Sequence, residues 1–142
     1  MANTAATRIT VQTIIEAPVA KVWELWTVPD HIINWNNASD EWHTPSATND
    51  LREGGSFTFT MAAKDGSASF DFGGKYGKVS TNELIEYSMA DGREVSISFQ
   101  TSGNSTTVVE SFDPEQTHSL EMQQVGWQAI LDNFKKYVEG HK

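Results

Sequence analysis

Side chains that could carry out acid–base or metal chemistry are few and scattered in this sequence. The histidines show no HExxH pair and no other close metal-ligand spacing (His31, His43, His118, His141). The chain also lacks GxSxG, P-loop and GxGxxG motifs, and it contains no cysteine, which excludes disulfides, thiolate catalysis and Cys-ligated zinc. We therefore expect no metal ion and no cofactor.

Three side chains remain as candidate general acids or bases: Glu110, Asp71 and His43. Asp71 alternates with two phenylalanines, so we expect it to face solvent. Glu110 lies an even number of residues from the apolar residues of its strand, so its side chain is expected on the same, inward face. A bulge in the strand would reverse this orientation. An inward carboxyl loses hydration, which raises its pKa and makes Glu110 the best candidate of the three. We assign none of them as catalytic.

The elements that must position these side chains begin with a strand and two short helices. Residues 9–15 alternate with a period of two, which predicts a strand. Pro18 suits the first turn of a helix, and apolar residues at positions 19, 22, 23 and 26 share one helical face. Pro29 opens a second short helix that carries Trp35. Residues 36–54 are expected to form a loop with a strand near 42–48.

From Gly55 onward the pattern predicts an antiparallel meander. Asp65-Gly66 and Asp91-Gly92 are hairpin turn signals, and Gly73-Gly74 predicts a bulge or a sharp bend. After Pro114, a long helix is expected over residues 116–139. Its predicted buried stripe has helical spacing and comprises Leu120, Gln124, Trp127, Leu131, Phe134 and Val138.

This element order predicts an α+β fold in one domain, residues 8–139. A helix is about 10 Å across, whereas six or seven strands about 4.8 Å apart span about 30 Å. The antiparallel sheet must therefore curl around the C-terminal helix or leave apolar surface in water. A sheet that curls around a helix readily encloses a cavity between the two.

The expected cavity is lined mainly by large rings that alternation directs toward the helix. Gln124 is the one polar residue of the predicted helix stripe, so it either bonds the sheet or orients a ligand. A glycine inside a helix lowers helix stability, so Gly126 implies a compensating reason, either close packing against the sheet or space for a ligand. Arg52 could hold a ligand carboxylate at the mouth or form a surface ion pair. The predicted ligand-binding set is Trp35, Phe57, Phe59, Met61, Phe70, Phe72, Tyr76, Phe99, Gln124, Trp127, Leu131 and Phe134.

The charge balance argues against several classes of partner. The chain has 10 Lys and Arg against 19 Asp and Glu, a net charge of −9. Bulk attraction to nucleic acid or to an anionic membrane is therefore not expected. No apolar run approaches 18 residues, so we expect no membrane insertion. We expect a cytoplasmic monomer.

Four short motifs in order along the chain resemble one family. They are IEAP followed by VW (residues 15–23), PDH leading to W (29–35), LREGGSF (51–57) and GW through L (126–131). Together they resemble the START-like (SRPBCC) superfamily with the helix-grip fold. The resemblance is closest to the branch related to the C-terminal domain of the activator of Hsp90 ATPase.

The resemblance implies a curved sheet that grips the long helix, with a pocket for hydrophobic small molecules between them. Relatives bind lipids, sterols or plant hormones, and some catalyse aromatic polyketide cyclisation. The leading expectation is a carrier or sensor for a lipid-like or aromatic molecule. The alternatives are an enzyme of the aromatase/cyclase or hydrolase type, and a module that contacts a chaperone and stimulates an Hsp90-like ATPase.

Overall fold

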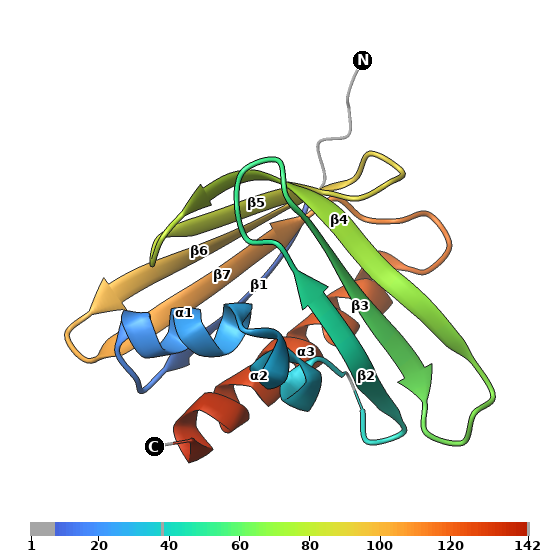
Figure 1. Cartoon of the computed structure of the whole chain (residues 1–142), viewed down its shortest axis with the longest axis horizontal. Coiled ribbons are helices and arrows are strands. Elements are labelled where there is room, and N and C mark those ends of the chain that lie inside the picture. The colour runs from blue at the N-terminus through green and yellow to red at the C-terminus, as the bar shows by residue number, and fades with distance from the viewer. Residues whose placement is uncertain (1–7, 38, 142) are drawn as a thin grey trace.

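The computed structural model describes residues 8–37 and 39–141, which form one seven-stranded sheet and three helices (Figure 1). The strands are β1 (Ile9–Ile15), β2 (Trp42–Asn49), β3 (Ser56–Ala63), β4 (Ser69–Ser80), β5 (Leu84–Ser88), β6 (Glu94–Ser102) and β7 (Ser105–Phe112). The helices are α1 (Val19–Thr27), α2 (Pro29–Trp35) and α3 (Leu120–Gly140).

The sheet is an antiparallel meander that the first strand completes. Its strand order is β1-β7-β6-β5-β4-β3-β2, so β1 lies beside the last strand and β2 forms the other edge. Figure 1 shows the sheet curling into a half-barrel, with α3 crossing its concave side and α1 and α2 beside it. The predicted α+β helix-grip fold is confirmed.

The two short helices form where the prolines predict them. Pro18 is the N-cap residue of α1, and Pro29 occupies the first turn of α2, where its missing N–H leaves no bond unmade. α1 buries Val22 and Trp23 against the sheet. The indole nitrogen of Trp35 donates to the carbonyl oxygen of Leu25 at 2.9 Å, which ties the two helices together.

The C-terminal helix begins at Leu120, four residues later than predicted. The Ser119 hydroxyl accepts the backbone N–H of Met122 at 3.1 Å, which caps the helix. The carboxylate of Glu115 accepts the backbone N–H of His118 at 2.6 Å. This local side-chain bonding holds the preceding residues in a turn and delays the start of the helix.

The predicted buried stripe of α3 is correct from Trp127 onward and wrong before it. Leu120 is 48% exposed, and Gln124 is exposed, with its amide donating to the carbonyl of Thr10 at 3.3 Å. Gln123 is the buried amide instead, and it bonds the loop before the helix, donating to the His118 carbonyl at 2.9 Å. Helical spacing identified a common face, but in the first turns of α3 the buried side is the one that faces the preceding loop.

Two expectations about glycines are also corrected. The pairing of β3 with β4 continues without a shift through Gly73 and Gly74, and the irregularity lies at Gly77, between Tyr76 and Lys78. A Cβ added at Gly126 would meet no atom within 4 Å, so close packing against the sheet does not explain this glycine.

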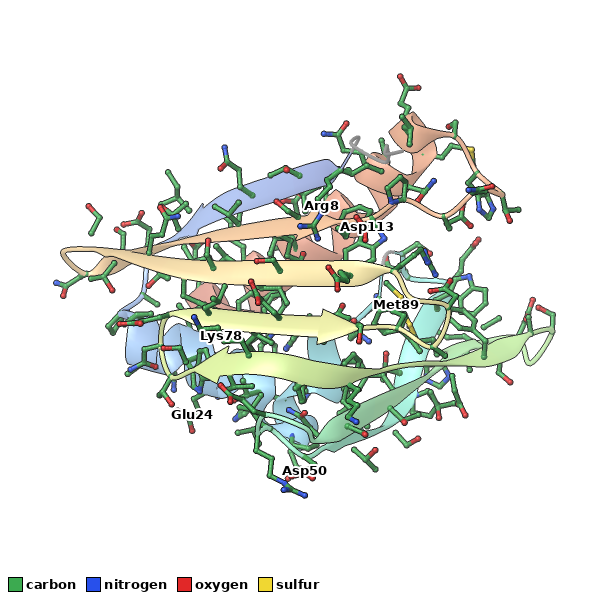
Figure 2. All side chains as sticks on the ribbon, turned by 90° about the horizontal axis from the view of Figure 1, so that it is seen from above. Arg8, Glu24, Asp50, Lys78, Met89 and Asp113 are labelled. Carbon is green, nitrogen blue, oxygen red and sulfur yellow. The ribbon has the colours of Figure 1, made fainter. Side chains whose placement is uncertain are left out.

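The outer face of the sheet carries the polar side chains. Figure 2 shows Arg8 and Asp113 side by side at one end of this face, where their side chains form an ion pair of 3.3 Å. Arg8 also donates to the carbonyl of Glu94 at 3.0 Å. Among the described residues, none of the helices is both long and apolar enough to span a bilayer.

Candidate functional site

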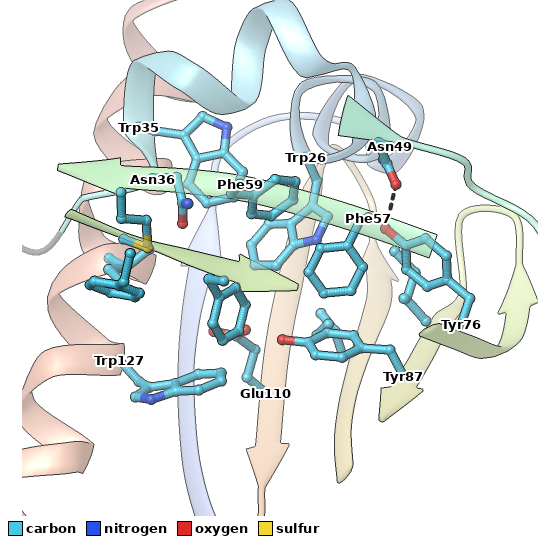
Figure 3. A pocket seen from close by; sticks show the side chains of 16 residues that line it. Trp26, Trp35, Asn36, Asn49, Phe57, Phe59, Tyr76, Tyr87, Glu110 and Trp127 are labelled. Atoms are coloured by element: carbon cyan, nitrogen blue, oxygen red, sulfur yellow. Dashed lines mark hydrogen bonds between the residues drawn. The ribbon is translucent and has the colours of Figure 1, made fainter. Parts of the chain in front are cut away.

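A cavity of about 220 Å³ lies inside the curl of the sheet (Figure 3). An apolar cavity of about 150 Å³ is enough to bind benzene, so this one has room for a larger ring compound. Its lining comes from all three helices and from six strands. It comprises Trp26, Trp35, Asn36, Asn49, Phe57, Phe59, Met61, Phe70, Phe72, Tyr76, Ile85, Tyr87, Ile97, Glu110, Trp127 and Ile130.

Exposure of the lining side chains distinguishes the floor of the cavity from its mouth. Phe57 and Ile97 are 3% and 1% exposed and belong to the floor. Phe70 is 51% exposed, and Met61 and Ile130 are half-buried. The mouth therefore lies between the tip of the β3–β4 hairpin and the middle of α3.

Eight of the twelve residues predicted to bind ligand line this cavity: Trp35, Phe57, Phe59, Met61, Phe70, Phe72, Tyr76 and Trp127. Phe99, Leu131 and Phe134 are buried elsewhere in the core. Trp26 of α1, which does line the cavity, packs edge-on against Phe99 at 5.9 Å and Phe134 at 4.8 Å between ring centroids, so these two phenylalanines fill core space beside it. Gln124 lies outside on the exposed part of α3.

Several residues that line the cavity were not predicted to bind ligand. Ile85 and Tyr87 lie on the inner face of β5. The same period-two alternation that placed the phenylalanines could have predicted both residues as part of the cavity lining. Trp26 was assigned only to the apolar face of its helix. Asn36 and Asn49 lie at the end of α2 and in edge strand β2, where no periodicity marks them.

The wall of the cavity is built around Phe57. Its ring lies 4.7 Å from that of Tyr87 in an edge-on arrangement, and 5.0 Å and 5.2 Å from those of Phe59 and Tyr76. Such aromatic pairs each contribute about 0.5–1.5 kcal/mol beyond the area they bury. The wall is therefore a connected set of rings.

Gly74 permits this packing because it has no side chain. A Cβ there would lie 2.8 Å from the Ser88 carbonyl oxygen and 3.0 Å from ring atoms of both Phe57 and Tyr87. Any larger residue would push these two rings apart. The second glycine of the pair that suggested a bulge therefore makes room for the aromatic wall.

Glu110 projects from β7 into the cavity, as its parity predicted. β7 alternates buried and partly buried residues without interruption, and Glu110 pairs in register with Val11 of β1 and Ile97 of β6. The side chain is buried, and loss of hydration raises the pKa of its carboxyl from 4.5 to about 8. At neutral pH this carboxyl is mostly protonated.

The other polar groups of the cavity differ in whether they have partners. The Tyr76 hydroxyl donates to Oδ1 of Asn49 at 2.5 Å, and burial raises the pKa of Tyr76. Burial also raises the pKa of Tyr87 well above 10, and the charge of the Glu110 carboxylate adds to this effect. Nδ2 of Asn36 is buried with no hydrogen-bond partner among the described residues.

The remaining candidates lie away from the cavity. Asp71 is exposed and accepts a hydrogen bond from the Thr60 hydroxyl at 2.9 Å. His43 is exposed and lines a separate, shallow hollow. Arg52 pairs with Asp50 at 3.0 Å, and its side chain is 72% exposed, so the ion-pair interpretation is confirmed. Over the described residues, no cluster of three His, Asp or Glu side chains could hold a metal ion.

Comparisons with known proteins agree with this architecture. The family model described as Activator of Hsp90 ATPase homolog 1-like protein matches residues 16–139. The solution structure of an AHSA1-like protein from Aeromonas hydrophila is 46% identical, with a TM-score of 0.89 over 95% of this chain and 94% of that one. A protein of Cytophaga hutchinsonii is 57% identical, with a TM-score of 0.82 over 94% of this chain and 93% of that one.

More distant proteins share the fold alone. A Nitrosomonas europaea protein is 18% identical, with a TM-score of 0.82 over 100% of both chains. No curated protein matches the chain. Because the family model spans most of the sequence and two solved structures are similar over nearly their whole length, the assignment rests on the entire fold. The chain belongs to the activator of Hsp90 ATPase homolog 1-like family, within the START-like superfamily of helix-grip proteins.

Proposed function

We propose that this protein binds a small hydrophobic molecule, ring-containing or lipid-like, in the cavity between the curled sheet and α3, as a carrier or sensor. Membership of the family supports a ligand-binding or chaperone-related module. The observation that carries the proposal is a cavity of about 220 Å³ whose wall is mostly aromatic and aliphatic. Burying about 200 Å² of apolar ligand surface favours binding by about 5 kcal/mol before the entropy lost on association.

Intrinsic fluorescence gives a direct test, because three of the five tryptophans line the cavity: Trp26, Trp35 and Trp127. Titration with naphthalene derivatives should quench or shift this emission and reach saturation. Ile130→Phe narrows the mouth and should weaken binding. Val125→Phe adds similar bulk on the same helix at a position that is 65% exposed, so it should leave binding unchanged. An unsaturable response to every ring compound contradicts the proposal.

A second candidate is catalysis of the cyclase or hydrolase type, which the placement of Glu110 favours. A buried, protonated carboxyl that faces an apolar cavity can act as a general acid toward a carbonyl oxygen. In that case Glu110→Gln should still bind a ring compound but lose turnover. Mass spectrometry of aryl esters and aryl polyketones incubated with the protein should then show products that the variant does not form.

A chaperone contact is the third candidate, and the exposed apolar side chains of α3 favour it. Met122 and Val125 lie one turn apart and are 61% and 65% exposed. If this surface contacts an Hsp90-like protein, the purified chain should stimulate the ATPase of that chaperone. Replacing both residues with serine should abolish the stimulation without changing ligand binding.

A further inference from the structure

Three polar groups that line the cavity make no hydrogen bond to any other group of the described residues. They are the carboxyl of Glu110, the hydroxyl of Tyr87 and Nδ2 of Asn36, which come from β7, from β5 and from the end of α2. The three residues are only 6%, 9% and 8% exposed. Figure 3 shows the Tyr87 hydroxyl and the Glu110 side chain turned toward the interior between Trp127 and Phe57. Nδ2 of Asn36 is fully buried without a partner, which is unusual for a polar group, and Glu110 and Tyr87 line the same cavity. The three groups are therefore placed to bond a ligand.

All three groups can donate a hydrogen bond in the state that burial favours. An amide nitrogen only donates, and a phenol donates through its O–H. The carboxyl of Glu110 is mostly protonated at neutral pH because its pKa is about 8, so it donates as well. The hydroxyl of Tyr76, which also lines the cavity, already donates to Asn49 and is not available to a ligand.

The surroundings of Glu110 disfavour a negatively charged ligand. The other titratable groups of the cavity are Tyr87 of β5 and Tyr76 of β4, and neither is cationic. The strands beside Glu110 present Val11 and Ile97, and α3 contributes Trp127 and Ile130 to the lining. Arg93 acts on Tyr87 from the β5–β6 turn but does not line the cavity. A carboxylate or phosphate would therefore find no positive partner here.

We propose that the cavity selects an uncharged ring compound that carries acceptor oxygens, of the aryl ketone or quinone class, with Glu110, Tyr87 and Asn36 donating to those oxygens. This inference rests on the proposed ligand binding. Fatty acids and other anions are then poor ligands, and a ring hydrocarbon without acceptors binds less tightly than its ketone.

Four naphthalene probes of similar size test this selection at pH 6.5, with binding followed by fluorescence or by NMR. They are 2-acetylnaphthalene, 2-isopropylnaphthalene, 2-naphthoate and 2-naphthylmethylamine. The ketone should bind about tenfold more tightly than the hydrocarbon, which is the effect of one good hydrogen bond. The naphthoate should bind more weakly than either. Tyr87→Phe and Glu110→Leu should each reduce the preference for the ketone.

The pH dependence of ketone binding gives a readout that a purely structural role would not change. When Glu110 ionises, the ketone loses the hydrogen bond from the protonated carboxyl, so affinity should fall about eightfold between pH 6.5 and 9.5. Glu110→Gln keeps a donor at every pH, so it should bind the ketone at both pH values with similar affinity. Glu86→Gln, on the same sheet but exposed, should behave as the unaltered protein does.

Each outcome of this experiment leads to a definite conclusion. If the hydrocarbon binds saturably but the ketone is not preferred, this inference is wrong and the proposed function stands. If the amine or the naphthoate binds most tightly, the site selects a charged ligand and the inference is wrong. If none of the four probes binds, both the inference and the proposed function are overturned.

Discussion

Replacing Glu110 with glutamine should stabilise the folded protein, and by an amount that grows with pH. Gln has almost the same shape but no ionisable proton. In the folded state burial holds the pKa of Glu110 near 8, whereas in the unfolded chain it returns to about 4.5. The folded state therefore holds this proton more tightly. In the unaltered protein, the contribution of this bound proton to folding stability is fully present below pH 4.5 and is lost as pH rises toward 8. The glutamine variant has no such proton to lose, so its advantage grows over the same range.

The size of the effect follows from the two pKa values. Between them the unfolded chain has released its proton and the folded state has not, so stability falls by about 1.4 kcal/mol for each pH unit. From pH 5 to pH 8 the loss at Glu110 amounts to about 3.5 kcal/mol. This is a large part of the 5–15 kcal/mol typical of a whole domain.

Chemical denaturation with urea at pH 5, 6.5 and 8 measures this difference. The free energy of unfolding of Glu110→Gln minus that of the unaltered protein should rise by about 3.5 kcal/mol across the series. All other titrating groups are common to both proteins and cancel in the difference. Glu86→Gln is the matched control, because this exposed change should stay within about 0.5 kcal/mol. A difference for Glu110→Gln that does not vary with pH would refute the account of its burial.

Three further changes test the packing around the cavity. Gly126→Ala should stabilise the protein by about 0.5–1 kcal/mol, because the helix gains propensity and the new methyl meets no atom within 4 Å; a lower melting temperature would contradict this. Gly74→Ala should destabilise by about 1–3 kcal/mol in urea, since its Cβ would lie 2.8 Å from a carbonyl oxygen; unchanged stability would show that the strands shift freely. Phe134→Ala removes a fully buried ring and should lower the free energy of unfolding by about 3–5 kcal/mol, and a loss under 1 kcal/mol would argue against its place in the core.

Local pattern was sufficient to predict most of the fold. Period-two alternation located the strands, and prolines at positions 18 and 29 located the two short helices. The same alternation directed Glu110 inward, and no bulge intervened in β7 to reverse it. These features depend on neighbours in sequence, which is why the sequence alone revealed them.

The errors came from features that depend on distant parts of the chain. Helical spacing placed Gln124 on the apolar face of α3, but whether that face is covered depends on how far the sheet extends. Phe99 and Phe134 point inward as predicted, yet Trp26 of α1 fills the space beside them. An inward ring can line a cavity or fill it, and only the packing of the other elements decides which.

The central claim is that a ring compound enters the cavity and reaches its floor. Three isoleucines line the cavity, with Ile85 and Ile97 buried and Ile130 half-buried on α3 near the mouth. Isotope-filtered NMR of the protein with 2-acetylnaphthalene should show nuclear Overhauser effects from the naphthalene protons to the methyl groups of Ile85 and Ile97. Effects confined to the exposed methyls of Met122 and Val125, or no effects at all, would contradict the claim.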